Sequence, residues 1–430
     1  MTTGVIDERS RRRGDVIGGV TTFFTMAYII VVNPHILATE GTGMPFDGVL
    51  AATILIAASM TLLMGLYAKI PFAVAPGMGI NAFFTYSLVL GQKVPWPIAL
   101  GIVFWAGVLF LVVSMTPIRE RIAQAIPTSL RSAAAAGIGL FLTFIGLKNA
   151  GLVVASPTTF VTMGKLTVPS LLAVAGLVVM VVLTRRGSPV ALLSGMALVT
   201  LAGIVTGHVR MPERLFSTPD FGAVFLKLDV LGALKPALLP AMLALLFTDL
   251  FDSISTLVGV SHATGMLDEK GEPRRLREGL IVDAFATFGA GLFGTSSGTA
   301  YIESAAGIEA GARTGRASVV TALCFLPCLF LSPIAAMVPP FATAPVLVLV
   351  GALMFRSVAR IEMTKLEDAI PVFLTIVLIP LTFSITEGMI WGFLTHVVLY
   401  VLAGRRKEIQ PAMYAIAAVS AGILVLQSIT

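Results

Sequence analysis

Two aspartates interrupt an apolar stretch in the middle of the chain, "LLFTDLFDSIST" at residues 245–256. Asp249 and Asp252 are three residues apart, so they share one face of a helix, and Ser253 and Thr256 extend that face by another turn. Carboxylates in such a setting can accept hydrogen bonds from N–H groups, coordinate a cation or carry a proton. We therefore expect this helix face to line a polar site.

Two other apolar segments each carry a polar residue after a break in the helical pattern. In "PFAVAPGMGINAFF" (71–84) the break precedes Asn81, and in "GLFGTSSGTAYIESAAGIEAG" (291–311) it precedes Glu303. Proline removes a backbone donor and glycine weakens a helix. Each segment is therefore expected to begin with partly extended backbone and to continue as a helix, whose N-terminal N–H groups would point at a common centre.

The rest of the chain is strongly apolar. Of its 430 residues, 57% are hydrophobic and 12% are charged, and the mean hydropathy is +0.95. A soluble domain carries about 25% charged residues, so this chain has too little polar surface to cover a soluble core. It is predicted to be a polytopic membrane protein. Because a lone aspartate costs roughly 2.5–3.5 kcal/mol at the bilayer centre, the acids and Asn81 are expected to converge on a cavity at mid-depth.

Apolar runs of about 16–24 residues predict fourteen transmembrane segments. They lie near residues 16–37, 48–67, 71–91, 96–116, 132–147, 169–184, 189–207, 237–260, 279–294, 295–311, 317–338, 342–357, 369–385 and 387–403. The sequence leaves open whether a further run near 411–428 also spans. The predicted fold class is all-α, with the segments arranged as a 7+7 inverted repeat, because the second set of seven would enter the membrane from the opposite face.

The distribution of basic residues supports this count and sets an orientation. With the N-terminus in the cytoplasm, 22 of the 29 Lys and Arg, Arg131 among them, fall in inside loops and seven in outside loops. The basic pI of about 9.5 is then explained by topology signals, and nucleic-acid binding need not be invoked. The chain begins without a signal-peptide pattern, so the first span is expected to be retained in the cytoplasmic membrane.

The predicted cavity holds two or three acids and no intramembrane Lys or Arg. It would repel an inorganic anion and could accept a cation or a neutral solute rich in N–H donors, such as a planar nucleobase. Phe83, Phe84 and Tyr301 could supply apolar faces for stacking. Asp283, near the start of the ninth segment, is expected to reach the interface. Four scattered histidines and a cysteine pair on one apolar helix indicate no metal site or cofactor.

Four longer stretches lie on these same segments: "TTFFTMAYIIVVNP" (21–34), "APGMGINAFF" (75–84), "TDLFDSISTLVG" (248–259) and "TAYIESAAGIEAGARTG" (299–315). They resemble the signature motifs of the purine-transporting permeases of the azaguanine-resistance branch, within the nucleobase–ascorbate or nucleobase–cation symporter family. The resemblance runs from about residue 15 to 407. It implies import of adenine, guanine or hypoxanthine, not enzyme activity.

The resemblance also implies a core domain of spans 1–4 and 8–11, a gate domain of spans 5–7 and 12–14, and short antiparallel strands in the third and tenth segments. The core would move against the gate in an elevator-like manner, with proton symport favoured over sodium, in a homodimer. The predicted divisions are an N-terminal cytoplasmic tail (1–15), a first core region (16–116), a first gate region (117–207), an extracytoplasmic loop (208–236), a second core region (237–338), a second gate region (339–403) and a C-terminal segment of open placement (404–430).

The resemblance implies roles for the residues of this chain that match positions in the family motifs. Asp252 and Glu303 resemble the two carboxylates that hold the base, and Asn81 resembles the polar residue of the third segment. Asp249 resembles an additional essential acid, which we expect to tune or carry the coupling proton. The predicted substrate site is completed by Ser253, Thr256, Tyr301 and Phe83.

One stretch departs from the family pattern. Where the family has a threonine-rich "TST-VTTYIES", this chain has "TSSGTAYIES". Gly298 and Ala300 leave fewer hydroxyl groups there, so the sequence does not tell which purine is preferred.

Three other functions are alternatives to purine import. An anion transporter of the same architecture would need a cation near the broken helices, and Asp252 and Glu303 argue against it. An intramembrane aspartyl protease needs two carboxylates facing each other, whereas Asp249 and Asp252 lie side by side on one helix. A channel is disfavoured by the inverted repeat with broken helices.

Overall fold

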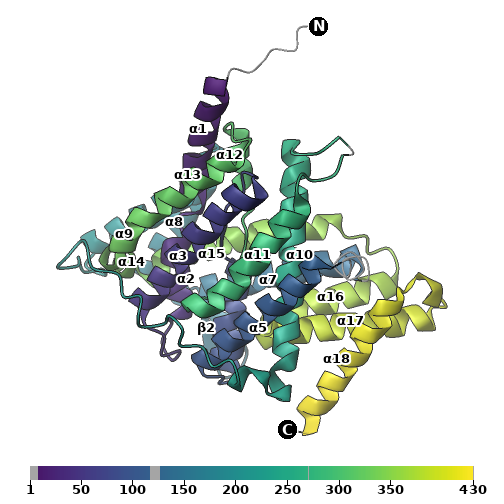
Figure 1. Ribbon diagram of the computed structural model, residues 1–430. Coiled ribbons are helices and arrows are strands. Elements are labelled where there is room, and N and C mark those ends of the chain that lie inside the picture. The colour runs from purple at the N-terminus through teal and green to yellow at the C-terminus, as the bar shows by residue number, and fades with distance from the viewer. Residues whose placement is uncertain (1–7, 117–125, 270, 430) are drawn as a thin grey trace.

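The computed structural model describes residues 8–116, 126–269 and 271–429, which form a helical bundle (Figure 1). Residues 1–7 of the predicted tail, residues 117–125 at the start of the predicted gate domain, and Lys270 lie outside the described residues.

The first half of the chain forms helices interrupted by one short strand and one hairpin. Its elements are α1 (Glu8–Met26), α2 (Ile29–Leu37), α3 (Phe46–Leu63), the π-helix η1 (Met64–Ala68), β1 (Val74–Pro76), α4 (Met78–Ala82), the π-helix η2 (Phe83–Gly91), α5 (Trp96–Met115), α7 (Thr128–Asn149), β2 (Val153–Ser156), β3 (Phe160–Met163), α8 (Val168–Arg185) and α9 (Ala191–Val205). The exposed hairpin of β2 and β3 was not predicted from the sequence.

The second half repeats the pattern of long helices around one broken segment. Its elements are the 3₁₀ turns η3 (Gly232–Leu234) and η4 (Pro236–Leu238), α10 (Leu239–Thr264), α11 (Leu276–Phe293), β4 (Gly298–Ala300), α12 (Ser304–Glu309), α13 (Gly315–Phe325), η5 (Leu326–Phe330), α14 (Ser332–Met337), α15 (Pro340–Phe355), η6 (Arg356–Arg360), α16 (Leu366–Thr382), α17 (Ile385–Leu402), η7 (Arg406–Glu408) and α18 (Pro411–Ile429).

Local sequence explains several helix ends. Gly265 and Gly294 adopt the left-handed conformation, with φ of 69° and 94°, and end α10 and α11. Thr167 and Ser170 form a reciprocal capping box at the start of α8. The hydroxyl of Ser384 caps α17 by accepting a hydrogen bond from the N–H of Glu387 at 3.2 Å.

Eight helical stretches in the described part of the chain are long and apolar enough to cross a membrane. They are Glu8–Leu37, Phe46–Ala68, Trp96–Met115, Thr128–Asn149, Val168–Arg185, Pro236–Thr264, Pro340–Arg360 and Ile385–Leu402. Four shorter apolar helices are Met78–Gly91, Ala191–Val205, Gly315–Phe330 and Pro411–Val425. The chain is therefore a mostly helical, multi-pass membrane protein, and each of the fourteen predicted segments contains helix.

The long helices pack in two groups. In one group α11 packs on α5 and α3, and α13 packs on α1 and α3. In the other, α7 packs on α15 and α16, α16 on α17, and α8 on α9 and α15. The helix α10 belongs to the first group through α5 and α11, and it also contacts α7 and α17 of the second. It therefore lies where the two groups meet, near the middle of Figure 1.

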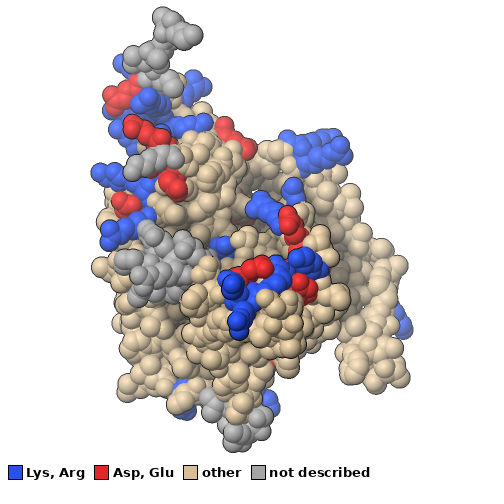
Figure 2. All heavy atoms as spheres, turned by 90° about the vertical axis from the view of Figure 1, so that its right-hand side faces the viewer, with Lys and Arg blue, Asp and Glu red and all other residues tan. Residues whose placement is uncertain are grey.

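The last helix lies at the edge of the bundle, and the charged side chains are unevenly distributed over the surface. α18 packs against α17 on the outside of the molecule (Figure 1). Figure 2 shows that the charged side chains on this face gather in its upper and middle parts, including the N-terminal end of α1, whereas its lower part is almost uncharged.

Candidate functional site

The two broken segments meet as a pair of short antiparallel strands. β1 pairs with β4 in the register Val74↔Ala300, Ala75↔Thr299 and Pro76↔Gly298, which confirms the strands predicted in the third and tenth segments. The pair is extended by a hydrogen bond from the N–H of Gly77 to the Ser297 carbonyl at 2.9 Å. Both strands are buried, and their ladder satisfies backbone groups that would otherwise be costly in a membrane.

Asp249 is fully buried behind these strands. One of its oxygens, Oδ2, accepts hydrogen bonds from the hydroxyls of Thr287, on α11, and Ser297, the latter at 2.6 Å. The other oxygen, Oδ1, has no partner among the described residues. Asp249 is therefore held by the neighbouring helix and by the tenth segment, while half of its carboxylate stays unsatisfied.

The observed position of Asp283 differs from the one predicted from the sequence. The sequence places it near the membrane interface, but it is fully buried and accepts a hydrogen bond from Ser253. Ser253 also lies 3.1 Å from the Thr299 hydroxyl. Asp283 is one turn before Thr287 on α11, and this i, i+4 pair of polar groups was the signal that could have placed it facing Asp249.

The other two acids are less enclosed. Asp252 and Glu303 are each partly exposed, whereas Asp249 and Asp283 are fully buried. The hydroxyl of Tyr28 donates to Glu303 Oε1 at 2.7 Å and so fixes this carboxylate. Tyr28 was not singled out in the sequence.

Hydrogen bonds bring three of these acids together. Ser253, which donates to Asp283, directly follows Asp252 on α10. Thr287, which donates to Asp249, lies one turn after Asp283 on α11. Four acids therefore lie around β4, where the sequence predicted two or three.

The remaining predicted site residues fall into two sets. Asn81, on α4, accepts a hydrogen bond from Ser296 through Oδ1, while its buried Nδ2 has no partner among the described residues. Tyr301 donates through its hydroxyl to the Pro76 carbonyl at 2.5 Å, so it ties the two broken segments together. Phe83 and Thr256 are also buried, 2% and 8% exposed.

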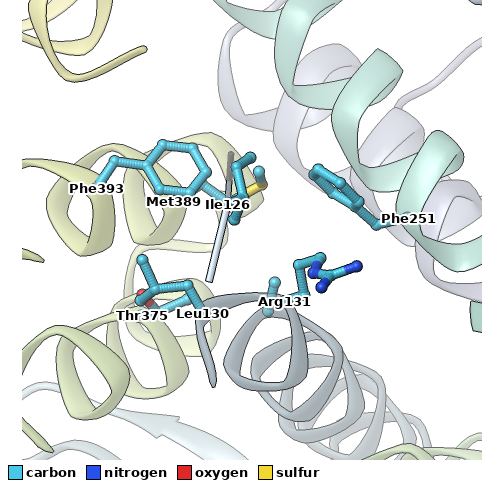
Figure 3. A pocket seen from close by; sticks show the side chains of 8 residues that line it. Ile126, Leu130, Arg131, Phe251, Thr375, Met389 and Phe393 are labelled. Atoms are coloured by element: carbon cyan, nitrogen blue, oxygen red, sulfur yellow. The ribbon is translucent and has the colours of Figure 1, made fainter. Parts of the chain in front are cut away.

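A basic residue of α7 lies beside α10. The charge pattern assigns Arg131 to a cytoplasmic loop, but it is partly buried in the first turn of α7, with its guanidinium 5.8 Å from the Phe251 ring centroid. Its Nε has no hydrogen-bond partner among the described residues. Figure 3 shows the Arg131 side chain beside Phe251 in the wall of a small pocket, which Thr375 of α16 and Met389 and Phe393 of α17 also line.

This arrangement can bind a solute through hydrogen-bond acceptors and can carry a proton. Among the described residues, no group of three or more His, Cys, Asp and Glu side chains is placed to hold a metal ion. Asp252 and Glu303 offer accessible acceptors, Asn81 offers a donor, and Asp249 and Asp283 supply buried carboxylates behind them.

Comparisons with known proteins identify the family of the chain. The model of a family described as "Xan_ur_permease: Permease family" matches residues 13–390. A putative permease of Methanocaldococcus jannaschii is 47% identical over 95% of this chain and 93% of its own length. The adenine permease AdeP of Escherichia coli is 40% identical over 94% of this chain and 91% of its own length. The guanine/hypoxanthine permease PbuG of Bacillus subtilis is 40% identical over 94% of both chains.

Solved structures show the same fold at low sequence identity. The transmembrane domain of a cyanobacterial bicarbonate transporter, BicA, has a TM-score of 0.65 and 18% identity, over 88% of this chain and 97% of that domain. The murine anion transporter Slc26a9, in an inward-facing state, has a TM-score of 0.60 and 10% identity, over 94% of this chain and 69% of its own.

Proposed function

Because the chain belongs to the Xan_ur_permease family, we propose that it is a secondary active transporter that imports the purine nucleobases adenine, guanine or hypoxanthine. Its relatives are permeases, so it is a membrane transporter and not an enzyme. The substrate class is supported by the adenine and guanine/hypoxanthine permeases that match it over almost their whole length.

The observation that carries the proposal is the set of acids around β1 and β4. A purine base is neutral, planar and rich in N–H donors, and Asp252 and Glu303 supply partly exposed carboxylates that can accept those hydrogen bonds. The contact from Tyr28 sets the direction of Glu303. Asn81 Nδ2 supplies a donor for a ring nitrogen or carbonyl, and Ser253, Thr256, Tyr301 and Phe83 complete the surroundings.

Anion transport is the second candidate, because the solved structures with this fold include a bicarbonate transporter. At 18% identity this likeness concerns the fold alone. An anion would meet four carboxylates around the strand pair, and Arg131 lies beside Phe251 with no described bond to any of these carboxylates. The acids therefore favour a nucleobase over an anion.

We infer that the buried acids couple transport to protons. Neighbouring carboxylates in a closed cavity of low dielectric constant cannot easily all ionise. Asp249 is fully buried, one helical turn from Asp252, and has one unpartnered oxygen among the described residues, on which a proton could sit. A proton taken up outside would neutralise part of the cavity and permit the loaded site to move. Sodium is the alternative coupling ion.

The two packing groups support an elevator-like movement. We propose that α1–α5 and α10–α14 form the core and that α7–α9 and α15–α17 form the gate, with fourteen segments in a 7+7 repeat and the N-terminus in the cytoplasm. Contacts between the groups at α10 include the approach of Arg131 to the Phe251 ring and the bond from Thr248 to the Met389 sulfur at 3.7 Å. We also propose that two copies of the chain form a homodimer.

Uptake into proteoliposomes tests the function. Labelled adenine, guanine, hypoxanthine, uracil and bicarbonate would be offered to the purified protein, with an inward proton gradient or an inward sodium gradient. We expect purine accumulation with the proton gradient in the absence of sodium, and loss of accumulation in Asp249→Asn. Bicarbonate uptake without purine uptake would overturn the substrate class. Accumulation that follows sodium and ignores the proton gradient would overturn proton coupling.

A further inference from the structure

A second cavity opens away from the acids, between the ends of several helices. Its volume is about 400 Å³, within the range typical of sites for small molecules. It lies between the end of η2, the start of α10 and the turn from α16 to α17. Its lining includes Tyr86, Gln92, Phe383, Thr386 and Glu387. We call it the outer vestibule, because these helix ends lie outside in the proposed orientation.

Thr386 gives the outer vestibule an unused hydrogen-bonding group. Its side chain is 4% exposed, and its hydroxyl has no hydrogen-bond partner among the described residues. Buried hydroxyls in native proteins are nearly always bonded, so an unpartnered hydroxyl in the wall of a cavity can take a partner from a ligand. Glu387 and Gln92, in the same lining, add a carboxylate and an amide.

Phe383 provides a fixed apolar wall. It has a φ of 52°, a left-handed conformation that is unusual for a bulky residue. Its carbonyl accepts a hydrogen bond from Ser87 of η2, and its ring packs edge-on against Phe141 and Phe144, with centroids 5.3 and 5.4 Å apart. Such strained residues concentrate at functional sites.

The outer vestibule and two of the acids share the helix α10. Met389 follows Thr386 by three residues on α17 and contacts Thr248, which precedes Asp249 on α10. The helices α10 and α17 therefore each carry lining residues of the outer vestibule and one partner of this contact. The walls come from both packing groups, since Ser87 belongs to the third segment and Phe383 to the α16–α17 hairpin.

We propose that the outer vestibule is a second nucleobase-binding subsite, which holds the purine before it passes the Met389–Thr248 contact. Thr386 and Glu387 accept N–H groups of the base, Gln92 donates to a ring nitrogen or carbonyl, and the base lies along Phe383 and Tyr86. This inference rests on the proposed function, because it names a further site for the same class of substrate.

Binding stoichiometry of the purified full chain tests the subsite. Saturating labelled adenine, or guanine if adenine is not transported, should bind to two sites in the wild type. In Thr386→Val, which keeps the side-chain shape and removes the hydroxyl, one of the two sites should bind about two- to tenfold more weakly. In Asp252→Asn the other site should be lost. Thr395→Val is the matched control on the same helix, since its hydroxyl bonds to the Trp391 carbonyl at 2.6 Å, and it should bind two.

Uptake provides an independent measurement. We expect Thr386→Val to raise the KM about two- to tenfold with an unchanged maximal rate, as loss of one hydrogen bond implies, and Thr386→Ser to restore the wild-type KM. A single site that Asp252→Asn abolishes, with wild-type behaviour of Thr386→Val, would overturn the subsite and leave the proposed function intact. Two sites unaffected by Thr386→Val would also overturn it. Failure of every variant and of the wild type to bind any purine would overturn both.

Discussion

At the scale of single residues, the four acids differ in their surroundings. Asp249 and Asp283 are fully buried and accept hydrogen bonds from Thr287, Ser297 and Ser253. Asp252 and Glu303 are partly exposed. We therefore expect the partly exposed acids to hold the base and the buried ones to carry charge.

The exposed acids should be essential for uptake. Glu303→Gln and Asp252→Asn keep the side-chain shape but lose a charge-assisted hydrogen bond, which is roughly twice as strong as a neutral one. We expect each variant to lose most purine uptake in intact cells at normal membrane abundance. Wild-type uptake by either variant would remove that residue from the substrate site.

Asp283 should affect transport without binding substrate directly. Asp283→Asn keeps the contact with Ser253 but removes a charge that faces Asp249 and Asp252. We expect a loss of uptake against a gradient, while labelled purine still binds to the purified protein. Asp220→Asn, on the exposed loop before α10, is the control and should transport normally. Loss of binding together with uptake would instead place Asp283 in contact with the base.

At the scale of elements, the broken third segment lies against the other packing group. Gly79, on α4, approaches Ile138 of α7 so closely that an added Cβ would lie 2.5 Å from Ile138 Cγ2. Gly77 is similarly close to Thr299 of the paired strand, at 2.8 Å. The glycines are therefore required by close packing on both sides of the segment, in addition to breaking its helix.

Gly79→Ala should slow uptake because the new methyl group meets α7, where the proposed core slides past the gate. Ile138→Ala removes the clashing Cγ2, so the double variant should recover some of the lost rate. Gly259→Ala is a matched control, since an added Cβ on that face of α10 meets nothing within 4 Å. Initial uptake rates, normalised to membrane abundance, measure the effect. A double variant no better than Gly79→Ala would argue against this contact as the cause.

At the scale of the whole molecule, the proposed orientation places the N-terminus in the cytoplasm. In the view of Figure 2, charged side chains of both signs lie in the upper and middle parts of the molecule, which include the start of α1. The turn after α10 and the long loop before it lie at opposite ends of that helix, so they should face opposite sides of the membrane.

Thiol labelling tests this orientation. In a background where Cys324 and Cys328 are replaced by Ser, an impermeant reagent applied to intact cells should modify Thr218→Cys in the long loop and spare Glu272→Cys. Neither position is buried, so the reagent can reach both within the protein. Permeabilised cells should be labelled at both. The reverse pattern in intact cells would invert the topology and place the outer vestibule on the cytoplasmic side.

Local patterns in the sequence determined where the helices, their breaks and most of the acids lie. Hydropathy and helical periodicity act over a few residues, so they located the apolar segments, placed Asp249 and Asp252 on one face, and predicted broken helices around Pro76 and Gly298. The family motifs supplied the pairing of the short strands and the roles expected of Asp252 and Glu303.

Only the tertiary structure decided which groups meet. Tyr28 and Glu303 are 275 residues apart, and Asp249 finds its partners 38 and 48 residues along the chain. Such contacts depend on how whole helices pack, which no local pattern encodes. For the same reason the sequence did not predict the full burial of Asp283 or the partial burial of Arg131. Each lies near the end of an apolar run, where the pattern weakens, and packing against other helices then decides how far it is buried.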